Sequence, residues 1–367
     1  MLLFYNIKIC LTSKRRTSIP PYKDHSLTTV APNAVNIQYF GRWEKGADTS
    51  RCGQGATYIK TNFTGTSIKV LLKDTGNWWR YSIDGKEFKR FKPHGSETTL
   101  AENLQPGTHK LVLTRSTEGY MGISEFRGFE IDDGSRLETP DAPKSRRLEF
   151  VGDSITAGAK NDGPASGPYN DIEDTDMSYG PQLARLLDAD YSIVAKSGEG
   201  VIHNWAEPWP GKEVHTSDRY AWTFYYDKFS NTNLKWNVKD FPVDGIVIAM
   251  GTNDFSDQKR KPTEAEFVQG YKKLIQTIRH MNPQATIICT EPVPNWVGGK
   301  ARAWIKESVD TLQVAGDKKL HYIGINENGP LLAESDYAGD STHPLKGGSA
   351  KIAAYLKDKV AAIMGWN

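Results

Sequence analysis

The chain has few cysteines, almost no excess charge and no long apolar run, and each absence narrows its possible functions. Its three cysteines in 367 residues, at positions 10, 52 and 289, predict neither a disulfide framework nor a zinc site. Lys and Arg number 46 against 44 Asp and Glu, and a net charge of +2 predicts no nucleic-acid partner. The eight histidines form no i, i+4 pair with a carboxylate, so we expect no metal and no cofactor.

Membrane association is not expected either. Residues 1–11 are apolar but interrupted by Asn6 and Lys8, and the positive charges follow the apolar part instead of preceding it. That order is wrong for a secretory signal, and the run is too short to span a bilayer. We expect a soluble protein with a poorly ordered leader at residues 1–34. The compartment and the oligomeric state stay open.

Residues 35–131 have the pattern of an all-β domain. Residues 67–73 alternate between apolar and polar for most of their length, as a half-buried strand does, and 109–114 alternate again. Two strand-like runs flank Asp84-Gly85, a strong hairpin signal. Frequent turn residues without a helical period predict a β-sandwich or jelly roll. Residues 132–146, which contain one glycine and two prolines, are interpreted as a linker.

From residue 147 to 367 the pattern of apolar residues changes to that of an α/β domain. Helical patterns, clearest at 264–281 and 345–364, alternate with strand-like runs at 148–151, 191–195, 245–250, 285–290 and 320–325. This alternation predicts a parallel sheet with helices on both faces. Polar segments that follow the first three strands should therefore meet at one edge of the sheet.

Three of the polar segments suggest ester hydrolysis. Ser154 follows a strand that stops at Gly152, so its hydroxyl should stand at the carboxyl edge of the sheet. Gly-Thr-Asn-Asp occupies 251–254, directly after a continuous apolar run. His343 lies three residues after Asp340, as a general base and its orienting acid require. Any one segment could be an ordinary turn, but the three in this order favour a serine esterase.

The segments resemble the blocks of the SGNH (GDSL-type) hydrolase superfamily over about residues 146–366. Ser154 matches the first block, Asn253 the third, and Asp340 with His343 the last. The second block follows the strand at 191–195, where Gly198 is assigned and Gly200 is a rival. With the β-rich region in front, the whole chain resembles the two-domain sugar deacetylases of carbohydrate esterase family two.

The resemblance implies a role for each matched residue. His343 would take the proton from Ser154, and Asp340 would hold the other ring nitrogen. The backbone N–H groups of Ser154 and Gly198 and the side-chain amide of Asn253 would bind the oxyanion. Asp153 and Asp254 are expected to be structural and to bond loop amides.

The implied substrate is an acetylated carbohydrate such as acetylated xylan or its oligosaccharides. Trp296 and Trp205 lie in predicted edge loops, where aromatic rings could stack on a sugar. Two alternatives stay open. One is a generic short-chain carboxylesterase or acylhydrolase, and the other is a carbohydrate-binding protein with an inactive hydrolase domain.

Overall fold

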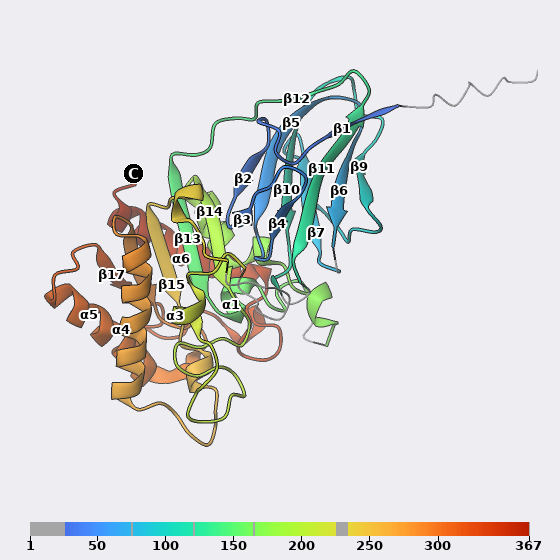
Figure 1. The fold of residues 1–367 in the computed structure, drawn as a ribbon. Helices are drawn as coiled ribbons and strands as arrows, with labels where there is room; N and C mark the ends of the chain where they lie inside the picture. The colour runs from blue at the N-terminus through green and yellow to red at the C-terminus, as the bar shows by residue number, and fades with distance from the viewer. Residues whose placement is uncertain (1–25, 75, 120–121, 164–165, 225–233, 367) are drawn as a thin grey trace, which may run out of the picture.

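The computed structural model describes residues 26–74, 76–119, 122–163, 166–224 and 234–366. An antiparallel β-sandwich comes first along the chain and packs against an α/β domain (Figure 1). This architecture confirms the predicted fold class. The expected leader spans residues 1–34, and its residues 1–25 lie outside the described part of the chain.

The β-sandwich consists of two antiparallel sheets of six strands each. One sheet contains β1 (Leu27–Val30), β3 (Trp43–Glu44), β4 (Ser50–Cys52), β6 (Ile68–Lys73), β9 (Glu97–Ala101) and β11 (Ser124–Asp132). The other contains β2 (Gln38–Phe40), β5 (Tyr58–Gly65), β7 (Trp79–Ile83), β8 (Lys89–Phe91), β10 (Gly107–Arg115) and β12 (Leu137–Glu138). The inner faces of both sheets supply one apolar core, with Phe63, Trp79 and Phe126 fully buried in it.

The predicted hairpin at Asp84-Gly85 is present. Strands β7 and β8 pair in antiparallel fashion, and both turn residues have positive φ, 56° at Asp84 and 71° at Gly85. Two successive positive φ values are typical of the tight turns that match the twist of a hairpin, and they favour Asp followed by Gly.

Two boundaries differ from the sequence expectation because short strands lie outside the predicted sandwich. Strand β1 falls in the expected leader, yet it pairs with β11 from Leu27 to Val30. Strand β12 falls in the expected linker, yet it pairs with β5. Strands this short carry too little periodicity to be recognised in sequence, and only pairing with a longer neighbour stabilises them.

The α/β domain is built on a five-stranded parallel sheet of order β14-β13-β15-β16-β17. Its strands are β13 (Arg146–Gly152), β14 (Ala189–Ala195), β15 (Gly245–Ala249), β16 (Thr286–Thr290) and β17 (Leu320–Ile323). Its α-helices are α1 (Ser154–Ala157), α2 (Tyr179–Leu186), α3 (Thr216–Arg219), α4 (Glu264–Met281), α5 (Gly298–Val314) and α6 (Lys346–Met364). Its short 3₁₀ helices are η2 (Tyr169–Asp171), η3 (Thr175–Met177), η5 (Val238–Asp240), η6 (Asn253–Phe255), η7 (Asn295–Val297) and η8 (Glu334–Asp336).

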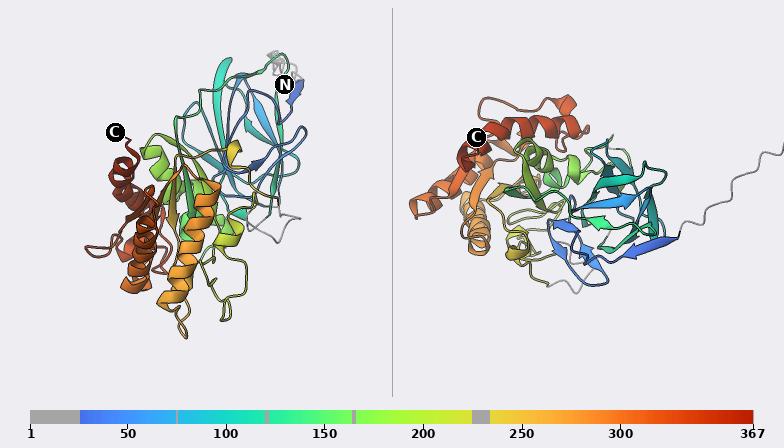
Figure 2. Two further views of the ribbon diagram at one scale, coloured as in Figure 1. Left: turned by 60° about the vertical axis from the view of Figure 1, so that its left-hand side comes forward. Right: turned by 90° about the horizontal axis from the view of Figure 1, so that it is seen from above.

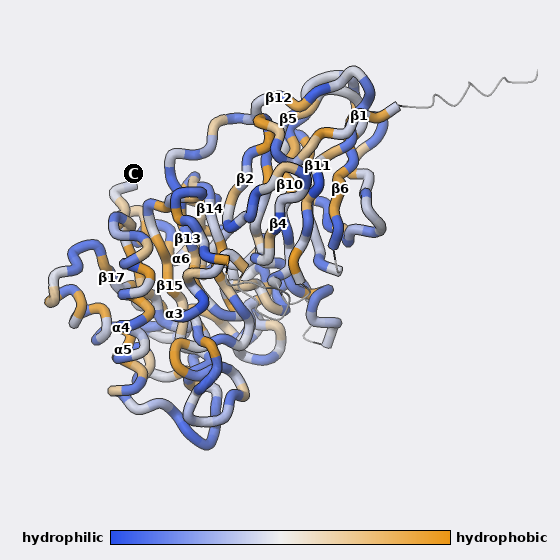
Figure 3. The backbone as a smooth tube through the Cα atoms, viewed as in Figure 1, coloured by the Kyte–Doolittle hydropathy of each residue, from blue (hydrophilic) through white to orange (hydrophobic). Residues whose placement is uncertain are grey.

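Helices cover both faces of this sheet, as the views in Figure 2 show. Helices α2 and α6 pack on one face, in a cluster that includes Val247 of β15. Helices α4 and α5 pack on the other, in a cluster that includes the neighbours Ile246 and Ile248. Successive side chains of a strand point to opposite faces, so a strand covered twice must be apolar throughout. Figure 3 shows this hydrophobic colour along β15.

The two domains share an apolar core. Phe40 and Tyr58 of the sandwich belong to the same buried cluster as α2 and α6. Tyr58 lies between two rings: it stacks on Phe40 with centroids 4.5 Å apart, and Tyr191 of β14 lies 4.8 Å from it. A buried aromatic contact of this kind predicts that the sandwich and the α/β domain hold a fixed relative position.

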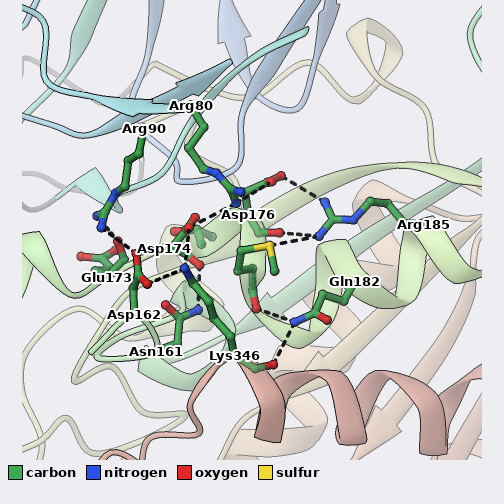
Figure 4. Close-up of polar contacts among 12 residues, drawn as sticks. Arg80, Arg90, Asn161, Asp162, Glu173, Asp174, Asp176, Gln182, Arg185 and Lys346 are labelled. Atoms are coloured by element: carbon green, nitrogen blue, oxygen red, sulfur yellow. Dashed lines mark hydrogen bonds and ion pairs between the residues drawn. The ribbon is translucent and has the colours of Figure 1, made fainter. Parts of the chain in front are cut away.

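Charged groups of the sandwich also hold the segment between α1 and α2. The guanidinium groups of Arg80 and Arg90 point from β7 and β8 toward carboxylates of the α/β domain (Figure 4). Arg90 bonds the Asp162 carboxylate at 2.9 Å, and Arg80 lies 3.2 Å from Asp174 and 3.3 Å from Asp176. This segment borders the carboxyl edge of the sheet, where the predicted site residues lie.

Candidate active site

The segments that follow β13, β14 and β15 meet because these three strands are neighbours in register. Strand β13 ends at Gly152, which lies opposite Ala195 of β14 on one side and Ala249 of β15 on the other. Parallel strands in register bring their carboxyl ends to one edge. The segments that follow these strands therefore face a common space.

A tight turn presents the Ser154 hydroxyl at this edge. Ser154 begins the one-turn helix α1, and the Asp153 side chain caps that helix by accepting the Ile155 N–H at 3.0 Å. A Cβ on Gly152 would lie only 1.9 Å from the Thr156 hydroxyl, so this position requires glycine. Burial raises the pKa of Asp153 to about 6. Asp153 has the structural role that the sequence predicts, but the amide that it accepts belongs to helix α1 and not to a loop.

Ser154, His343 and Asp340 form a continuous chain of hydrogen bonds. The Ser154 Oγ lies 2.9 Å from the His343 Nε2, and the His343 Nδ1 lies 2.7 Å from the Asp340 Oδ2. The other carboxylate oxygen of Asp340 accepts the backbone N–H groups of Thr342 and His343 at 3.0 and 2.9 Å. Both the carboxylate and the ring therefore have fixed orientations, and the serine sits within proton-transfer distance of the ring.

Asp340 has a further partner that the sequence did not reveal. The Lys160 Nζ lies 2.9 Å from the same Oδ2 that faces the His343 ring. Partial burial raises the pKa of Asp340, but the bonds from His343 and Lys160 outweigh it and hold the pKa well below its usual range. Asp340 is therefore a carboxylate at every pH at which a histidine base could work.

Gly198 and Asn253 line the same cavity as Ser154, whereas Gly200 does not. Gly198 has a φ of +79°, and within the described residues its N–H donates no hydrogen bond. The Gly200 N–H instead donates to the Asn204 side chain at 2.9 Å. One N–H of the Asn253 amide donates to the Glu199 carbonyl at 2.8 Å, and a side-chain amide carries two such donors. This geometry favours Gly198 over Gly200 as an oxyanion donor.

Asp254 anchors the segment that follows Gly200. Its buried carboxylate accepts the backbone N–H groups of Val201, Ile202 and His203 at distances between 2.8 and 3.1 Å. Burial raises the pKa of Asp254, and these three donors oppose that effect. Asp254 therefore bonds loop amides, as the sequence predicts, and connects the Asn253 segment to the Gly198 segment.

The cavity has a volume of about 670 Å³ and a mixed polar and aromatic lining. Trp205 and Trp296 both line it, with 69% and 41% of their surfaces exposed. The Trp296 Nε1 donates to the Thr342 hydroxyl at 3.1 Å, next to His343. Large exposed rings that line a cavity are available to a ligand.

Sequence reasoning missed the contribution of the β-sandwich to this cavity. Glu118, in the loop after β10, lines it together with Lys160, Tyr169 and Ser197. A glutamate more than 30 residues before the first motif carries no local signal of such a role.

Two other features of the described residues bear on the sequence expectations. They contain no group of three His, Cys, Asp or Glu side chains placed for a metal, and none of their helices is long and apolar enough to cross a bilayer.

Both domains match known families. Residues 39–140 match the model of the carbohydrate esterase 2 N-terminal domain, and residues 150–351 match the GDSL-like lipase/acylhydrolase family. A family two carbohydrate esterase from Clostridium thermocellum, solved in complex with cellohexaose, superposes with a TM-score of 0.80. It is 29% identical, and the alignment covers 90% of this chain and 100% of that one.

Two curated relatives extend the similarity. An acetylxylan esterase / glucomannan deacetylase of Cellvibrio japonicus is 30% identical over 303 residues, which cover 79% of each chain. The cellulase/esterase CelE of Acetivibrio thermocellus is 31% identical over 340 residues, which cover 90% of this chain. The chain spans only 40% of the length of CelE, so the similarity concerns one part of that protein.

Proposed function

Because the chain belongs to family two of the carbohydrate esterases, we propose that it is a serine esterase that removes O-acetyl groups from carbohydrates. The observation that carries this proposal is the chain of bonds from Ser154 through His343 to Asp340, open to a cavity of about 670 Å³. A serine hydroxyl is a weak nucleophile at neutral pH, and an oriented histidine base is the usual means of activating it.

In the first half-reaction the Ser154 Oγ attacks the acetyl carbonyl while the His343 Nε2 takes the hydroxyl proton. The carbonyl oxygen becomes an oxyanion, which the N–H groups of Ser154 and Gly198 and the Asn253 amide stabilise. The bond from the carbonyl carbon to the sugar oxygen then breaks. His343 returns its proton to that oxygen, so the sugar leaves as an alcohol and Ser154 stays acetylated.

In the second half-reaction water replaces the sugar. His343 takes a proton from the water, whose oxygen attacks the acetyl carbonyl and forms the second oxyanion. The bond to the Ser154 Oγ breaks, acetate leaves, and His343 returns the proton to the serine. Asp340 stays ionised throughout, because the bonds from His343 and Lys160 hold its pKa well below its usual range.

The proposed substrate is an acetylated xylan or xylo-oligosaccharide, with the sugar on the leaving-group side. The support comes from the two exposed tryptophans, Trp205 and Trp296, at the cavity, and from the acetylxylan esterase relative. The flat faces of indole rings suit the apolar faces of pyranose rings. We expect Trp296→Ala to impair acetylated xylo-oligosaccharides more than p-nitrophenyl acetate, because the aryl ester needs no sugar platform.

The test of the proposal is acetate release from acetylated xylo-oligosaccharides by the wild type and by Ser154→Ala. Wild-type turnover, covalent labelling by a serine-directed fluorophosphonate, and loss of both in Ser154→Ala support it. The mutant should melt close to the wild type, because the hydroxyl contributes little to the core. Substantial hydrolysis by folded Ser154→Ala would refute the nucleophile assignment.

Acyl-chain length separates a deacetylase from a generic acylhydrolase. An apolar acyl channel would add about 0.8 kcal/mol of binding for each buried methylene and favour long chains. We expect the opposite, a fall in kcat/KM from acetyl to butyryl to octanoyl esters. A preference for octanoyl esters would replace the deacetylase proposal with the acylhydrolase alternative.

A further inference from the structure

Glu118 reaches the catalytic cavity from the β-sandwich and bonds the loop that carries Gly198. Its Oε2 accepts the backbone N–H of Ser197 at 2.8 Å, and its Oε1 accepts the Tyr169 hydroxyl at 3.0 Å. Only 1% of the surface of Glu118 is exposed, although it lines the cavity. A buried carboxylate bonded to a loop amide of another domain holds that loop at a defined distance.

We propose that Glu118 is a positioning residue that the β-sandwich supplies to the oxyanion-binding loop of the hydrolase domain. This inference rests on the proposed function, because it assigns a purpose to the Gly198 N–H. It also gives the β-sandwich a part in catalysis, through one side chain that acts on residues 196–198.

The contacts around Gly198 are fixed on both sides. Before it, the Ser197 backbone is held by Glu118, and the Ser197 Oγ lies 2.5 Å from the Tyr169 hydroxyl. After it, the Gly198 carbonyl accepts the Trp205 N–H at 2.7 Å. The peptide unit between Ser197 and Gly198 is therefore restrained by its neighbours, and its N–H keeps a constant direction. An oxyanion donor is effective when it points at the developing charge before the reaction begins.

Glu118 itself is rigidly held by the sandwich. The Arg115 guanidinium is fully buried and donates to the Glu118 carbonyl at 3.0 Å, and also to the Asn77 side chain at 2.7 Å. The Glu118 N–H donates to the Glu173 carboxyl at 2.6 Å. Burial raises the pKa of Glu173 well above its usual range, and the neighbouring Glu118 carboxylate raises it further. A protonated Glu173 avoids placing two negative charges side by side.

Tyr169, the second partner of the Glu118 carboxylate, lies on the segment that Arg90 of the sandwich bonds. Arg90 donates to the Asp171 carbonyl at 2.8 Å and to the Glu173 carbonyl at 2.6 Å, on either side of the bend that follows Tyr169. The same β-sandwich thus places both the Glu118 carboxylate and the segment that carries its phenol partner. Loss of the Glu118 carboxylate should free the Ser197 amide without loosening the Arg90 contacts.

Three substitutions test this role. Glu118→Ala removes the acceptor, and Glu118→Asp keeps the charge but withdraws the carboxylate from the Ser197 N–H by one methylene. For both we expect kcat to fall by about tenfold to a hundredfold with little change in KM, because small displacements of a catalytic group can cost ~10² in rate. Glu118→Gln keeps an amide oxygen that can accept the Ser197 N–H, so it should retain most of the wild-type kcat.

Asp190→Ala is the matched control. Asp190 is also 1% exposed and also joins the two domains, since it accepts the Tyr58 hydroxyl and the Lys60 ammonium, both at 2.8 Å. It lies at the amino end of β14, away from the carboxyl edge of the sheet. We expect it to lower Tm without lowering kcat per active site, where fluorophosphonate labelling counts the active sites.

The outcomes separate this inference from the proposed function. A wild type that neither hydrolyses acetyl esters nor reacts with the fluorophosphonate would contradict the function itself. An active wild type with unchanged kcat in Glu118→Asp and Glu118→Ala would overturn the positioning role. Equal losses of kcat in Glu118→Gln and Glu118→Asp would also overturn it, because the acceptor for Ser197 would then be irrelevant. If Glu118→Ala does not fold, the Asp and Gln variants decide.

Discussion

The described part of each domain contains a histidine–aspartate pair, and the two pairs have nearly the same local geometry. In the β-sandwich the His109 Nδ1 lies 2.8 Å from the Asp84 Oδ2, and in the hydrolase domain the His343 Nδ1 lies 2.7 Å from the Asp340 Oδ2. In both, the other carboxylate oxygen accepts a nearby backbone N–H at 2.9 Å. The pair alone therefore does not define a catalytic site.

The difference lies at the second ring nitrogen. The His109 Nε2 faces the Gln105 carbonyl at 2.9 Å, and a carbonyl can only accept a hydrogen bond. The His343 Nε2 faces the Ser154 hydroxyl at 2.9 Å, and a hydroxyl can also donate one. A ring between two acceptors is most stable with both nitrogens protonated. A ring between a carboxylate and a hydroxyl can stay neutral and act as a base.

The charge on His109 follows from these partners. Burial lowers the pKa of His109, but the bonds to Asp84 and the Gln105 carbonyl outweigh it and raise the pKa above its ordinary value. The sandwich pair thus joins a hairpin turn to β10, while proton transfer is the role proposed for the hydrolase pair. The same two residue types perform different tasks because of one neighbouring group.

Exchanging each histidine for alanine should produce the largest contrast. We expect His343→Ala to lower kcat by several orders of magnitude, on the order of 10⁶ in a well-studied serine hydrolase, with a small change in Tm. His109→Ala should lower Tm and leave kcat per active site unchanged, because its ring contacts no part of the cavity. Steady-state kinetics and thermal unfolding of both variants measure this. A loss of kcat in His109→Ala would break the comparison.

Replacing each aspartate by asparagine should produce the second largest difference in kcat between the two pairs. Asp340→Asn is expected to lower kcat, by up to ~10⁴, because an amide favours the wrong tautomer of the ring. Asp84→Asn removes the same type of bond in the sandwich and should leave kcat unchanged. Kinetics on p-nitrophenyl acetate provide the measurement. Wild-type turnover in Asp340→Asn would mean that another group orients His343.

The proposed oxyanion donor Asn253 accompanies the hydrolase pair and has no counterpart in the comparison with the sandwich pair. Removing it tests that difference. Asn253→Ala should lower kcat by ~10²–10³ and change KM much less, since an oxyanion donor acts mainly in the transition state. The control is Asn62→Ala in the sandwich, whose amide donates to the Thr139 carbonyl far from the cavity. If Asn253→Ala raised KM alone, Asn253 would be a ground-state binding residue instead.

The two pairs should respond to pH in opposite directions. The raised pKa of His109 means that its pair stabilises the fold fully below the unfolded histidine pKa of ~6.5, and that this stability is lost as pH rises through the folded value. We expect the Tm difference between wild type and His109→Ala to shrink from pH 5 to pH 9. The partly exposed pair is worth at most about 1 kcal/mol.

Activity should instead rise with pH, because the proposed mechanism needs a neutral imidazole as the base. The pKa of Asp340 is held well below its usual range, so its stabilising contribution persists above the unfolded value and is lost only in strong acid. The acid limb of log kcat/KM against pH should therefore have the slope of a single ionisation. A flat profile from pH 5 to 8 would argue against a histidine base.

The smallest expected effect concerns Lys160, which has no counterpart in direct contact with Asp84 among the described residues. Its ammonium shares Oδ2 of Asp340 with the His343 ring, so it weakens the pull of the carboxylate on an imidazolium. Lys160→Met should shift the acid limb to higher pH by an amount equivalent to about 0.2–1 kcal/mol. Lys351→Met, which breaks a similar pair with Asp336, is the control. Identical profiles for wild type and Lys160→Met would exclude this electrostatic role.

Local sequence patterns determined the elements and the order of the site. Alternation and continuous apolar runs marked the strands, and the helix at 264–281 has the predicted limits because its Thr263–Glu266 capping box and its apolar spacing are local. The placement of Ser154, Asn253 and the segment that contains Gly198 and Gly200 at one edge followed from parallel topology, since each comes just after a strand that ends there. These signals depend on residues close together in the chain.

Only the tertiary structure decided which groups face one another. His343 and Ser154 are 189 residues apart, and the contact that separates this histidine from His109 exists only once the sheet and α6 have packed. The choice of Gly198 over Gly200 depended on where Asn204 folds back, and the contribution of Glu118 depended on the docking of two domains. Hydrogen-bond partners across such distances are set by packing of the apolar cores, and packing leaves no local pattern in the sequence.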